Sequence, residues 1–205
     1  MELATEAEVL AHDLAAQRIA VRGDADILRP TRTIAHGEEL RVGSLNLDVC
    51  YFGPNHSDSN LLVIVPTSQG RVLVWVDGVE PGVAPYRNLP DTDFGGYLRA
   101  LEQASRLDFE LVVGGHLGPA PRRWVSDYHE YLLWLLDATD QAYQQLGGQM
   151  PQPGEDGVAM TERVRAEVGA AAASRLRSRF GHWSGFEQWA PMTADRVLSF
   201  LITGN

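Results

Sequence analysis

The sequence predicts an α/β protein with a block of helices at its C-terminal end. Three observations predict this class. β-type runs joined by short turns fill the segment 39–76, helix-spaced apolar patterns follow them, and an alanine-rich segment lies beyond residue 158. Strands followed by helices along one chain are typical of α/β domains, and consecutive helices add a layer of their own. We therefore expect a helix-covered sheet with a helical extension.

The N-terminal segment predicts an amphipathic helix over Thr5–Ala20. Its apolar residues recur at every third or fourth position, at Leu3, Ala7, Leu10 and Leu14. This spacing places them on one face of a helix. His12 lies within the predicted helix, and we expect it on the helix surface.

Two β-hairpins are predicted next. Glu39–Val42 and Leu45–Tyr51 flank Gly43-Ser44, and Leu61–Pro66 and Arg71–Val76 flank the turn at 67–70. β-type runs separated by a short turn of this kind are typical of hairpins. The strands of the second hairpin are apolar at almost every position, which predicts that helices cover both faces of the sheet.

The rest of the chain predicts one short strand and four helices. A Gly/Pro loop at 78–92 leads into the first helix, with Asp91 or Thr92 as its N-cap, and the strand Glu110–Val113 follows. A long aromatic-rich helix covers 124–136. Ala159–Phe180 and Thr193–Leu201 form the last two helices, with Thr193 as the N-cap of the second.

These patterns divide the chain into three segments. Residues 1–145 form the main domain, 146–158 is a Gly/Pro linker or lid, and 159–205 is the helical extension. Trp183, Phe186 and Trp189 lie in the extension, where they either pack it on the domain or line a substrate pocket or a dimer face.

Composition excludes several classes of function. The 205-residue chain carries a formal net charge of −10, whereas proteins that bind nucleic acid are usually basic on one face. It has no run of about eighteen apolar residues, so no membrane span is expected. The N-terminus lacks the pattern of a signal peptide. A single cysteine, Cys50, excludes an internal disulfide and fits a reducing compartment, so we expect a cytoplasmic protein.

Three residues with side chains that can bind a metal ion follow three of the predicted strands. His56 follows Leu45–Tyr51, Asp77 follows Arg71–Val76, and His116 follows Glu110–Val113. Neighbouring parallel strands end at one edge of an open sheet, where sites collect. Two imidazoles and a carboxylate at one edge are a typical set of zinc ligands.

The motifs around these residues resemble the metallo-β-lactamase superfamily of hydrolases. Gly53-Pro54-Asn55-His56-Ser57-Asp58 is similar to its third histidine motif, Val74-Trp75-Val76-Asp77 to the strand that ends in the metal-bridging Asp, and Val113-Gly114-Gly115-His116 to its last histidine motif. The resemblance covers most of residues 1–140. It implies an αββα sandwich that is incomplete here, because the family's HxHxDH motif is absent from this chain and only the C-terminal half is represented.

The resemblance also implies a chemistry. His56 would ligate a first ion, Asp77 would bridge two ions, and His116 would ligate the second, with one or two zinc ions expected. Such ions lower the pKa of a bound water to about 7. Asp77 and His56 are therefore the expected catalytic residues. An Asp at the bridging position resembles the thioesterase, lactonase and glyoxalase-II branches, which implies hydrolysis of a small ester, thioester or lactone.

The missing motif leaves two hypotheses open. In the first, the chain is a metal-dependent hydrolase that requires its N-terminal half, supplied by a complementary polypeptide or replaced by homodimerisation. In the second, the half-fold is a non-catalytic assembly subunit. Both predict a long apolar sheet edge, which would favour pairing with another chain.

Overall fold

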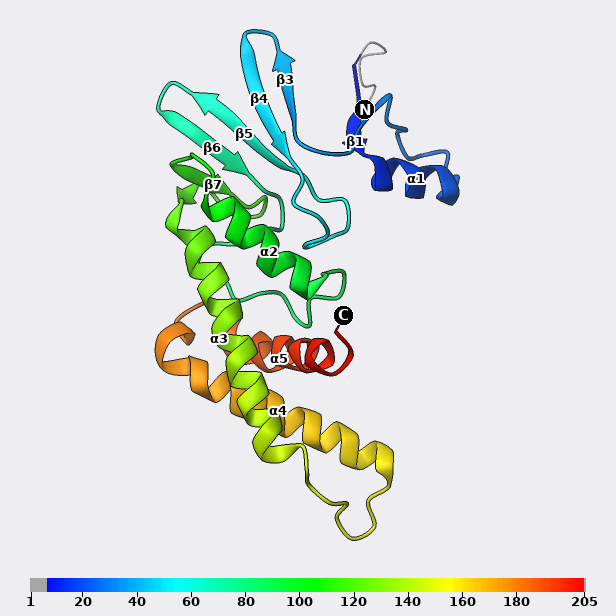
Figure 1. Cartoon of the computed structure of the whole chain (residues 1–205), viewed down its shortest axis with the longest axis vertical. Coiled ribbons are helices and arrows are strands. Elements are labelled where there is room, and N and C mark those ends of the chain that lie inside the picture. The colour runs from blue at the N-terminus through cyan, green and yellow to red at the C-terminus, as the bar shows by residue number, and fades with distance from the viewer. Residues whose placement is uncertain (1–6, 205) are drawn as a thin grey trace.

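The computed structural model describes residues 7–204 and arranges them in a two-stranded sheet, a six-stranded sheet and five helices (Figure 1). The part of the predicted N-terminal helix that precedes residue 7 lies outside the described residues. None of the five helices combines the length and the apolar character that crossing a membrane requires.

The N-terminal unit corrects the predicted helix over Thr5–Ala20. Residues Leu10–His12 form strand β1, which pairs in parallel with β2 (Arg32–Ile34), and helix α1 covers only Asp13–Arg22. The helix begins late because the His12 side chain caps it, accepting a hydrogen bond from the Leu14 N–H at 3.2 Å. No residue of α1 is buried, so no apolar face anchors the helix further upstream.

The six-stranded sheet contains both predicted hairpins. Its strands are β3 (Glu38–Val42), β4 (Leu45–Cys50), β5 (Leu62–Thr67), β6 (Gly70–Val74), β7 (Leu111–Val113) and β8 (Ala120–Pro121). They lie in sequence order, and every neighbouring pair is antiparallel except β6 and β7, which are parallel. As a result β4, β6 and β7 run in the same direction and end at the same edge of the sheet.

Helices α2 (Phe94–Ser105) and α3 (Arg123–Leu146) pack on one face of this sheet (Figure 1). Alternate strand residues, such as Ile64, Leu73 and Val112, are buried against them. The N-cap of α2 is Asp93, not Asp91 or Thr92, because the Asp93 carboxylate accepts the hydrogen bond of the Gly96 N–H.

The opposite face of the sheet is not covered by helices to the extent predicted. Its residues pair across β5, β6 and β7, and each remains half-buried or exposed: Val63, Val65, Val72, Val74, Leu111 and Val113. We call this set the valine face. Only the end of this face near β3 and β4 is closed, by a small cluster that contains Ile34, Leu40 and Val49. The continuous apolar runs therefore reflect one buried face and one half-buried face.

The edges of the sheet also differ from the prediction of a long apolar edge. The edge strand β3 carries Glu38, Glu39 and Arg41, and the other edge strand, β8, has only two residues and ends in Pro121. Charged, short or proline-containing edges disfavour pairing with further strands. The exposed apolar surface of this sheet is therefore the valine face, and not one of its edge strands.

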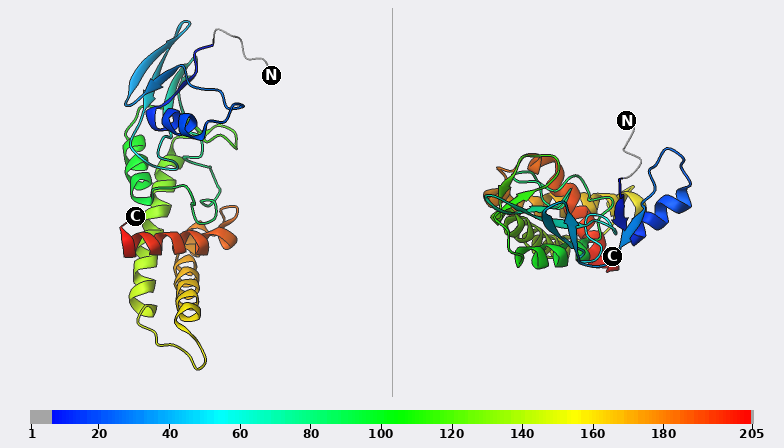
Figure 2. Two further views of the ribbon diagram at one scale, coloured as in Figure 1. Left: turned by 90° about the vertical axis from the view of Figure 1, so that its right-hand side faces the viewer. Right: turned by 90° about the horizontal axis from the view of Figure 1, so that it is seen from above.

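Helices α4 (Gly157–Phe180) and α5 (Phe186–Thr203) complete the structure. Helix α4 crosses α3 obliquely in Figure 1 and lies beside it in the left view of Figure 2, and α5 packs against both. Trp183, between α4 and α5, stacks on Tyr128 and Tyr131 of α3 with ring centroids 5.4 and 5.1 Å apart. The helical extension thus shares the main core with the sheet, while the division into three segments stays a prediction.

Helix α5 begins earlier than predicted. Its N-cap is Gly185, whereas Thr193 lies inside the helix and is fully buried. The Thr193 hydroxyl donates a hydrogen bond to the Arg87 carbonyl at 2.7 Å, which ties the helix to the loop at 78–92.

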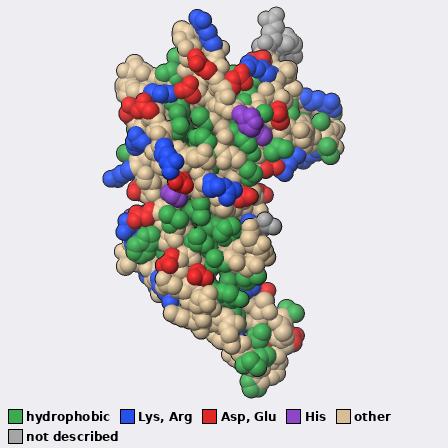
Figure 3. Space-filling model, viewed as in Figure 1, with side chains coloured by type: hydrophobic (Ala, Val, Ile, Leu, Met, Phe, Trp, Pro, Cys, Tyr) green, Lys and Arg blue, Asp and Glu red, His purple; other side chains and the backbone are tan. Residues whose placement is uncertain are grey.

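On the face drawn in Figure 3, acidic and basic side chains are interspersed, so the net charge of −10 forms no region of a single sign there.

Candidate metal centre

Three loops at the shared edge of the sheet bring the predicted site residues together. His56 lies between β4 and β5, Asp77 follows β6, and His116 follows β7. Asn60 links the first two loops, because its side-chain amide donates a hydrogen bond to the Val76 carbonyl at 2.9 Å. The convergence predicted from the strand order is confirmed.

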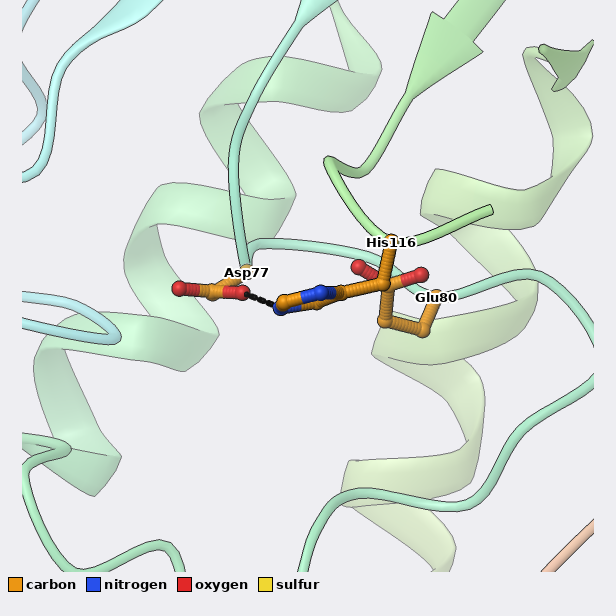
Figure 4. Close-up of side chains that lie close together, drawn as sticks. All are labelled: Asp77, Glu80 and His116. Atoms are coloured by element: carbon orange, nitrogen blue, oxygen red, sulfur yellow. Dashed lines mark hydrogen bonds and ion pairs between the residues drawn. The ribbon is translucent and has the colours of Figure 1, made fainter. Parts of the chain in front are cut away.

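Asp77 lies between the two histidines. Its Oδ1 atom is 2.6 Å from Nε2 of His116, and its Oδ2 atom is 3.5 Å from Nε2 of His56 (Figure 4 shows the His116 side). The side chains of Asp77 and His56 are about one-third exposed, at 33% and 34%, so a small molecule can reach them. The first contact is a hydrogen bond and the second an ion-pair distance, so each imidazole faces its own carboxylate oxygen.

Glu80 is a site residue that sequence reasoning missed. Asp77, Glu80 and His116 each offer one potential ligand atom, and these three atoms lie within 4.8 Å of one another (Figure 4). Both Glu80 carboxylate oxygens are buried, and neither makes a hydrogen bond of good geometry among the described residues, although the His116 backbone N–H lies close to them. Burial raises the pKa of Glu80, and the charge of Asp77 raises it further, whereas His116 opposes the rise. Its position three residues after Asp77, in the same loop, is the signal that could have identified it.

These donors fit a divalent metal ion. Imidazole nitrogen and carboxylate oxygen are the ligands that zinc takes besides thiolate. A buried carboxylate without a hydrogen-bond partner is unfavourable unless a cation or a proton compensates it. The unpartnered Glu80 is therefore the structural observation that favours a cation at this place, although the ligand roles of His56, Asp77 and His116 stay predictions.

The backbone around Asp77 is held in an unusual conformation. Asp77 has φ of 59°, in the left-handed region, and its N–H donates a hydrogen bond to the Gly114 carbonyl at 2.8 Å. A Cβ atom on Gly114 would lie 2.0 Å from the Val79 carbonyl oxygen, so the two loops can approach only because this residue is glycine. Backbone strain of this kind persists where the surrounding structure fixes it, often at functional sites.

The His56 loop is fixed by Asn55, which is fully buried. The Asn55 side chain accepts a hydrogen bond from the His56 N–H at 2.8 Å and donates one to the Gly53 carbonyl at 2.9 Å. The Asn55 carbonyl also accepts the Asp93 N–H at the start of α2, at 3.0 Å. Asn55 therefore orients the His56 loop and joins it to the start of α2.

A pocket of about 550 Å³ opens beside the three loops. Its walls come from His56, Asp77, Glu80 and His116 on one side, from the loop at 83–91 and Trp189 on the other, and from Tyr97 and Tyr128. Of the three aromatic residues singled out in the sequence of the extension, Trp183 and Phe186 are buried packing residues, and Trp189 lines this pocket.

Two further residues lie outside the pocket, and the first of them differs from the prediction. His12 is not on a helix surface but is 5% exposed, and its ring lies 4.0 Å from that of Tyr51 between centroids. Cys50 is half-buried in β4, and burial raises the pKa of its thiol. Neither lies with the candidate ligands.

The comparison with solved structures defines the fold class. The structure matches a metallo-beta-lactamase from Pontibacter korlensis with a TM-score of 0.51 and 21% identity, over 61% of this chain and 57% of that one. It matches the crystal structure of VMB-1 with a TM-score of 0.50 and 19% identity, over 62% and 56% of the two chains. The chain therefore has the metallo-β-lactamase fold over about 60% of its length, and that fold is incomplete.

One curated protein is also similar in sequence. This is the 2,4-dinitroanisole O-demethylase subunit alpha of Nocardioides sp. (strain JS1661), which is 33% identical over 135 residues. The match covers 64% of this chain, but the chain spans only 38% of that relative's length. No family model matches the chain.

Proposed function

We propose that this chain forms part of a zinc-dependent hydrolase that cleaves small esters, thioesters or lactones. The placement of Asp77 between His56 and His116 carries the proposal, because one carboxylate oxygen faces each imidazole. The metallo-β-lactamase fold and the unpartnered carboxylate of Glu80 support it.

In this proposal His56 would hold a first ion, His116 would hold the second, and Asp77 would contribute to both. Glu80 adds a carboxylate on the His116 side, within 4.8 Å of the other two donors. Zinc ions bound there would supply a nucleophile at neutral pH and polarise the scissile carbonyl. His56 and Asp77 are the proposed catalytic residues, since they line the pocket next to the place where substrate would bind.

The protein's own groups have further roles in this proposal. Asn55 and the Asp77–Gly114 hydrogen bond fix the two loops, so that the donors are positioned before any ligand arrives. The apolar walls of the pocket restrict water beside the reacting group, which strengthens electrostatic interactions there.

The described donors do not complete a two-ion site. A catalytic zinc ion usually takes three protein ligands. Among residues 7–204, His56 is the single histidine beside the Oδ2 atom of Asp77, where the first ion would lie. We propose that the remaining ligands come from a segment carrying HxHxDH, which stacks on the valine face. It would belong to an upstream part of the same protein or to a complementary polypeptide, or a second copy of this chain would take its place in a homodimer.

Metal content tests the ligand assignment. Protein purified without chelator is analysed for zinc and iron, together with the His56→Ala/His116→Ala double variant. A His36→Ala/His182→Ala variant is the matched control, because both of those histidines are exposed and outside the pocket. One or two ions per chain, lost only in the first variant, are expected. Equal metal in all three samples would refute the assignment.

Activity is then assayed with thioesters, lactones and aryl esters. 2,4-Dinitroanisole is included because the curated relative's name specifies it. The assay uses the chain alone and with any partner that copurifies. Turnover that requires both metal and Asp77 is the expected result.

A non-catalytic assembly subunit is the second candidate. The observation that favours it is the valine face, where six apolar side chains from three strands remain half-buried or exposed. The curated relative is named as a subunit. Light scattering after gel filtration separates the two proposals when it is combined with metal analysis, because a metal-free complex without turnover would favour the assembly subunit.

A further inference from the structure

We propose that the pocket beside Asp77 and His116 selects an uncharged substrate that carries a planar aryl group. This proposal rests on the proposed function, because it names the substrate class of the same site. Three features of the described pocket carry it: its aromatic wall, the absence of cationic side chains from its lining, and the anchoring of its outer loop.

The aromatic wall consists of Tyr86 and Trp189. Their rings are 5.2 Å apart between centroids and inclined at 75°, so the face of one ring meets the edge of the other. Tyr86 is 56% exposed, although it belongs to a pocket wall. Aromatic rings prefer offset or edge-to-face contacts with other rings, and each such contact adds to simple apolar burial. A planar ring in the pocket would gain this contact, and a saturated ring of equal size would not.

The pocket lining contains no arginine, and the chain as a whole contains no lysine. The charged residues of the lining are the acids Asp77, Glu80 and Asp91, together with the two histidines. The neighbouring Arg87 lies over the Tyr86 ring, 5.4 Å from its centroid, and is not part of the lining. A carboxylate or phosphate on the substrate would therefore find no fixed cationic partner away from the metal donors and would face Asp91.

The outer loop of the pocket is anchored on the helices behind it. Thr193 of α5 donates a hydrogen bond to the Arg87 carbonyl at 2.7 Å, and Tyr128 of α3 donates one to the Val83 carbonyl at 2.8 Å. Ser184 and Ala84 are also joined by a backbone hydrogen bond of 3.0 Å. These bonds hold the wall in place before a ligand binds, which reduces the ordering that binding requires. Helix α5 is thus part of the substrate site.

The volume of about 550 Å³ is suitable for a two-ring molecule, since pockets for small molecules span about 300–1,000 Å³. We would measure binding by calorimetry with three compounds of matched size: 2-naphthol, 2-naphthoate and decahydro-2-naphthol. Compared with 2-naphthol, 2-naphthoate carries an anionic carboxylate in place of the hydroxyl, and decahydro-2-naphthol lacks the planar aromatic rings. We expect 2-naphthol to bind about three- to tenfold more tightly than decahydro-2-naphthol, the effect of about one aromatic contact. We expect it to bind at least about tenfold more tightly than 2-naphthoate.

Two variants locate the binding site. Trp189→Leu and Tyr86→Leu should each remove the preference for 2-naphthol over its saturated analogue. Trp134→Leu is the matched control, because Trp134 is 45% exposed on α3 and lies outside the pocket. Tyr86 is exposed at the pocket, so its replacement tests the wall even if Trp189→Leu fails to fold. Leu117→Arg, which adds a cation to the lining at a position that is 46% exposed, should shift the preference toward 2-naphthoate.

Equal or tighter binding of 2-naphthoate by the unmodified protein would overturn the proposal, as would an unchanged preference in both wall variants. Metal content is measured on the same samples. Metal without the naphthol preference would overturn the substrate class alone. Naphthol binding by a protein that takes up no zinc would overturn the hydrolase proposal. The bound compound would then be a ligand and not a substrate analogue.

Discussion

The Oδ1 atom of Asp77 lies 2.6 Å from Nε2 of His116, although 39 positions separate the two residues in the sequence. The contact exists because β6 and β7 are parallel neighbours, so that the loops after them leave the sheet at the same edge. The same carboxylate faces His56 with its other oxygen at 3.5 Å. Asp77 is therefore the residue on which the proposed metal centre depends most.

Replacement of Asp77 by Asn should weaken metal binding with little effect on folding. Asn tolerates the left-handed conformation that Asp77 adopts at φ of 59°, so the loop should retain its shape. The amide carries no charge, and we expect zinc affinity to fall by at least about tenfold, since loss of even an outer-shell partner has that effect. Zinc competition with a chromophoric chelator measures it. Asp91→Asn, also in the pocket lining, should leave the affinity unchanged, and a loss equal to that of Asp77→Asn would contradict the assignment.

A methyl group on Gly114 should disrupt the contact between the two loops. The added Cβ would lie 2.0 Å from the Val79 carbonyl oxygen, which is backbone and cannot turn away. We expect Gly114→Ala to lower the free energy of unfolding by about 1–3 kcal/mol, as overpacking does, and to displace His116. Urea denaturation measures the first effect. Gly118→Ala is the control, because no atom lies within 4 Å of its added Cβ. Equal stability of the two variants would show that the loops do not pack as described.

Loss of the Thr193 hydroxyl should loosen the outer wall of the pocket. Thr193→Val keeps the shape of the side chain but leaves the Arg87 carbonyl without its 2.7 Å hydrogen bond. We expect a loss of about 1–3 kcal/mol in the free energy of unfolding. Amide hydrogen exchange at 85–89 should also become faster. Thr161→Val, at an exposed position of α4, is the reference, and protection of 85–89 that is equal in both variants would refute the anchoring role.

The pH dependence of stability should include a contribution from His129 on α3. Partial burial lowers the pKa of its imidazole, so the folded state favours the neutral form more than the unfolded state does. The stabilising contribution is complete above the ordinary histidine pKa of about 6.5 and is lost as the pH falls through the lower pKa of the folded state. His129→Gln should reduce the loss of thermal stability between about pH 7 and pH 5. His36→Gln, at an exposed position, should not, and a pH profile unchanged in His129→Gln would contradict the prediction.

Local patterns predicted the parts of the fold that local forces determine. The turns at Gly43 and at 67–70 mark both hairpins, and the alanine-rich composition of 159–180 predicts α4 within two residues at its start. The order of strands and polar loop residues also predicts that His56, Asp77 and His116 converge, because strand ends share an edge. These predictions required no knowledge of how distant segments pack.

The errors lie where distant contacts override local preference. Thr193 has a typical N-cap side chain, yet it is buried within α5 because its hydroxyl bonds to the carbonyls of a distant loop. Leu10 fits a helical pattern but pairs in β1 with Arg32. Glu80 was missed because its nearness to Asp77 in the sequence is a weak signal, and its burial beside His116 becomes visible only in the structure.

The charged β3 edge and the two-residue β8 have a consequence for how copies of this chain associate. Strand pairing at an edge creates a new edge, so such growth repeats and leads to fibres. Once a partner covers the valine face, that face is no longer exposed to bind another molecule. Association through this surface should therefore stop at a single pair of layers, and the chain should form closed complexes of defined size even at high concentration.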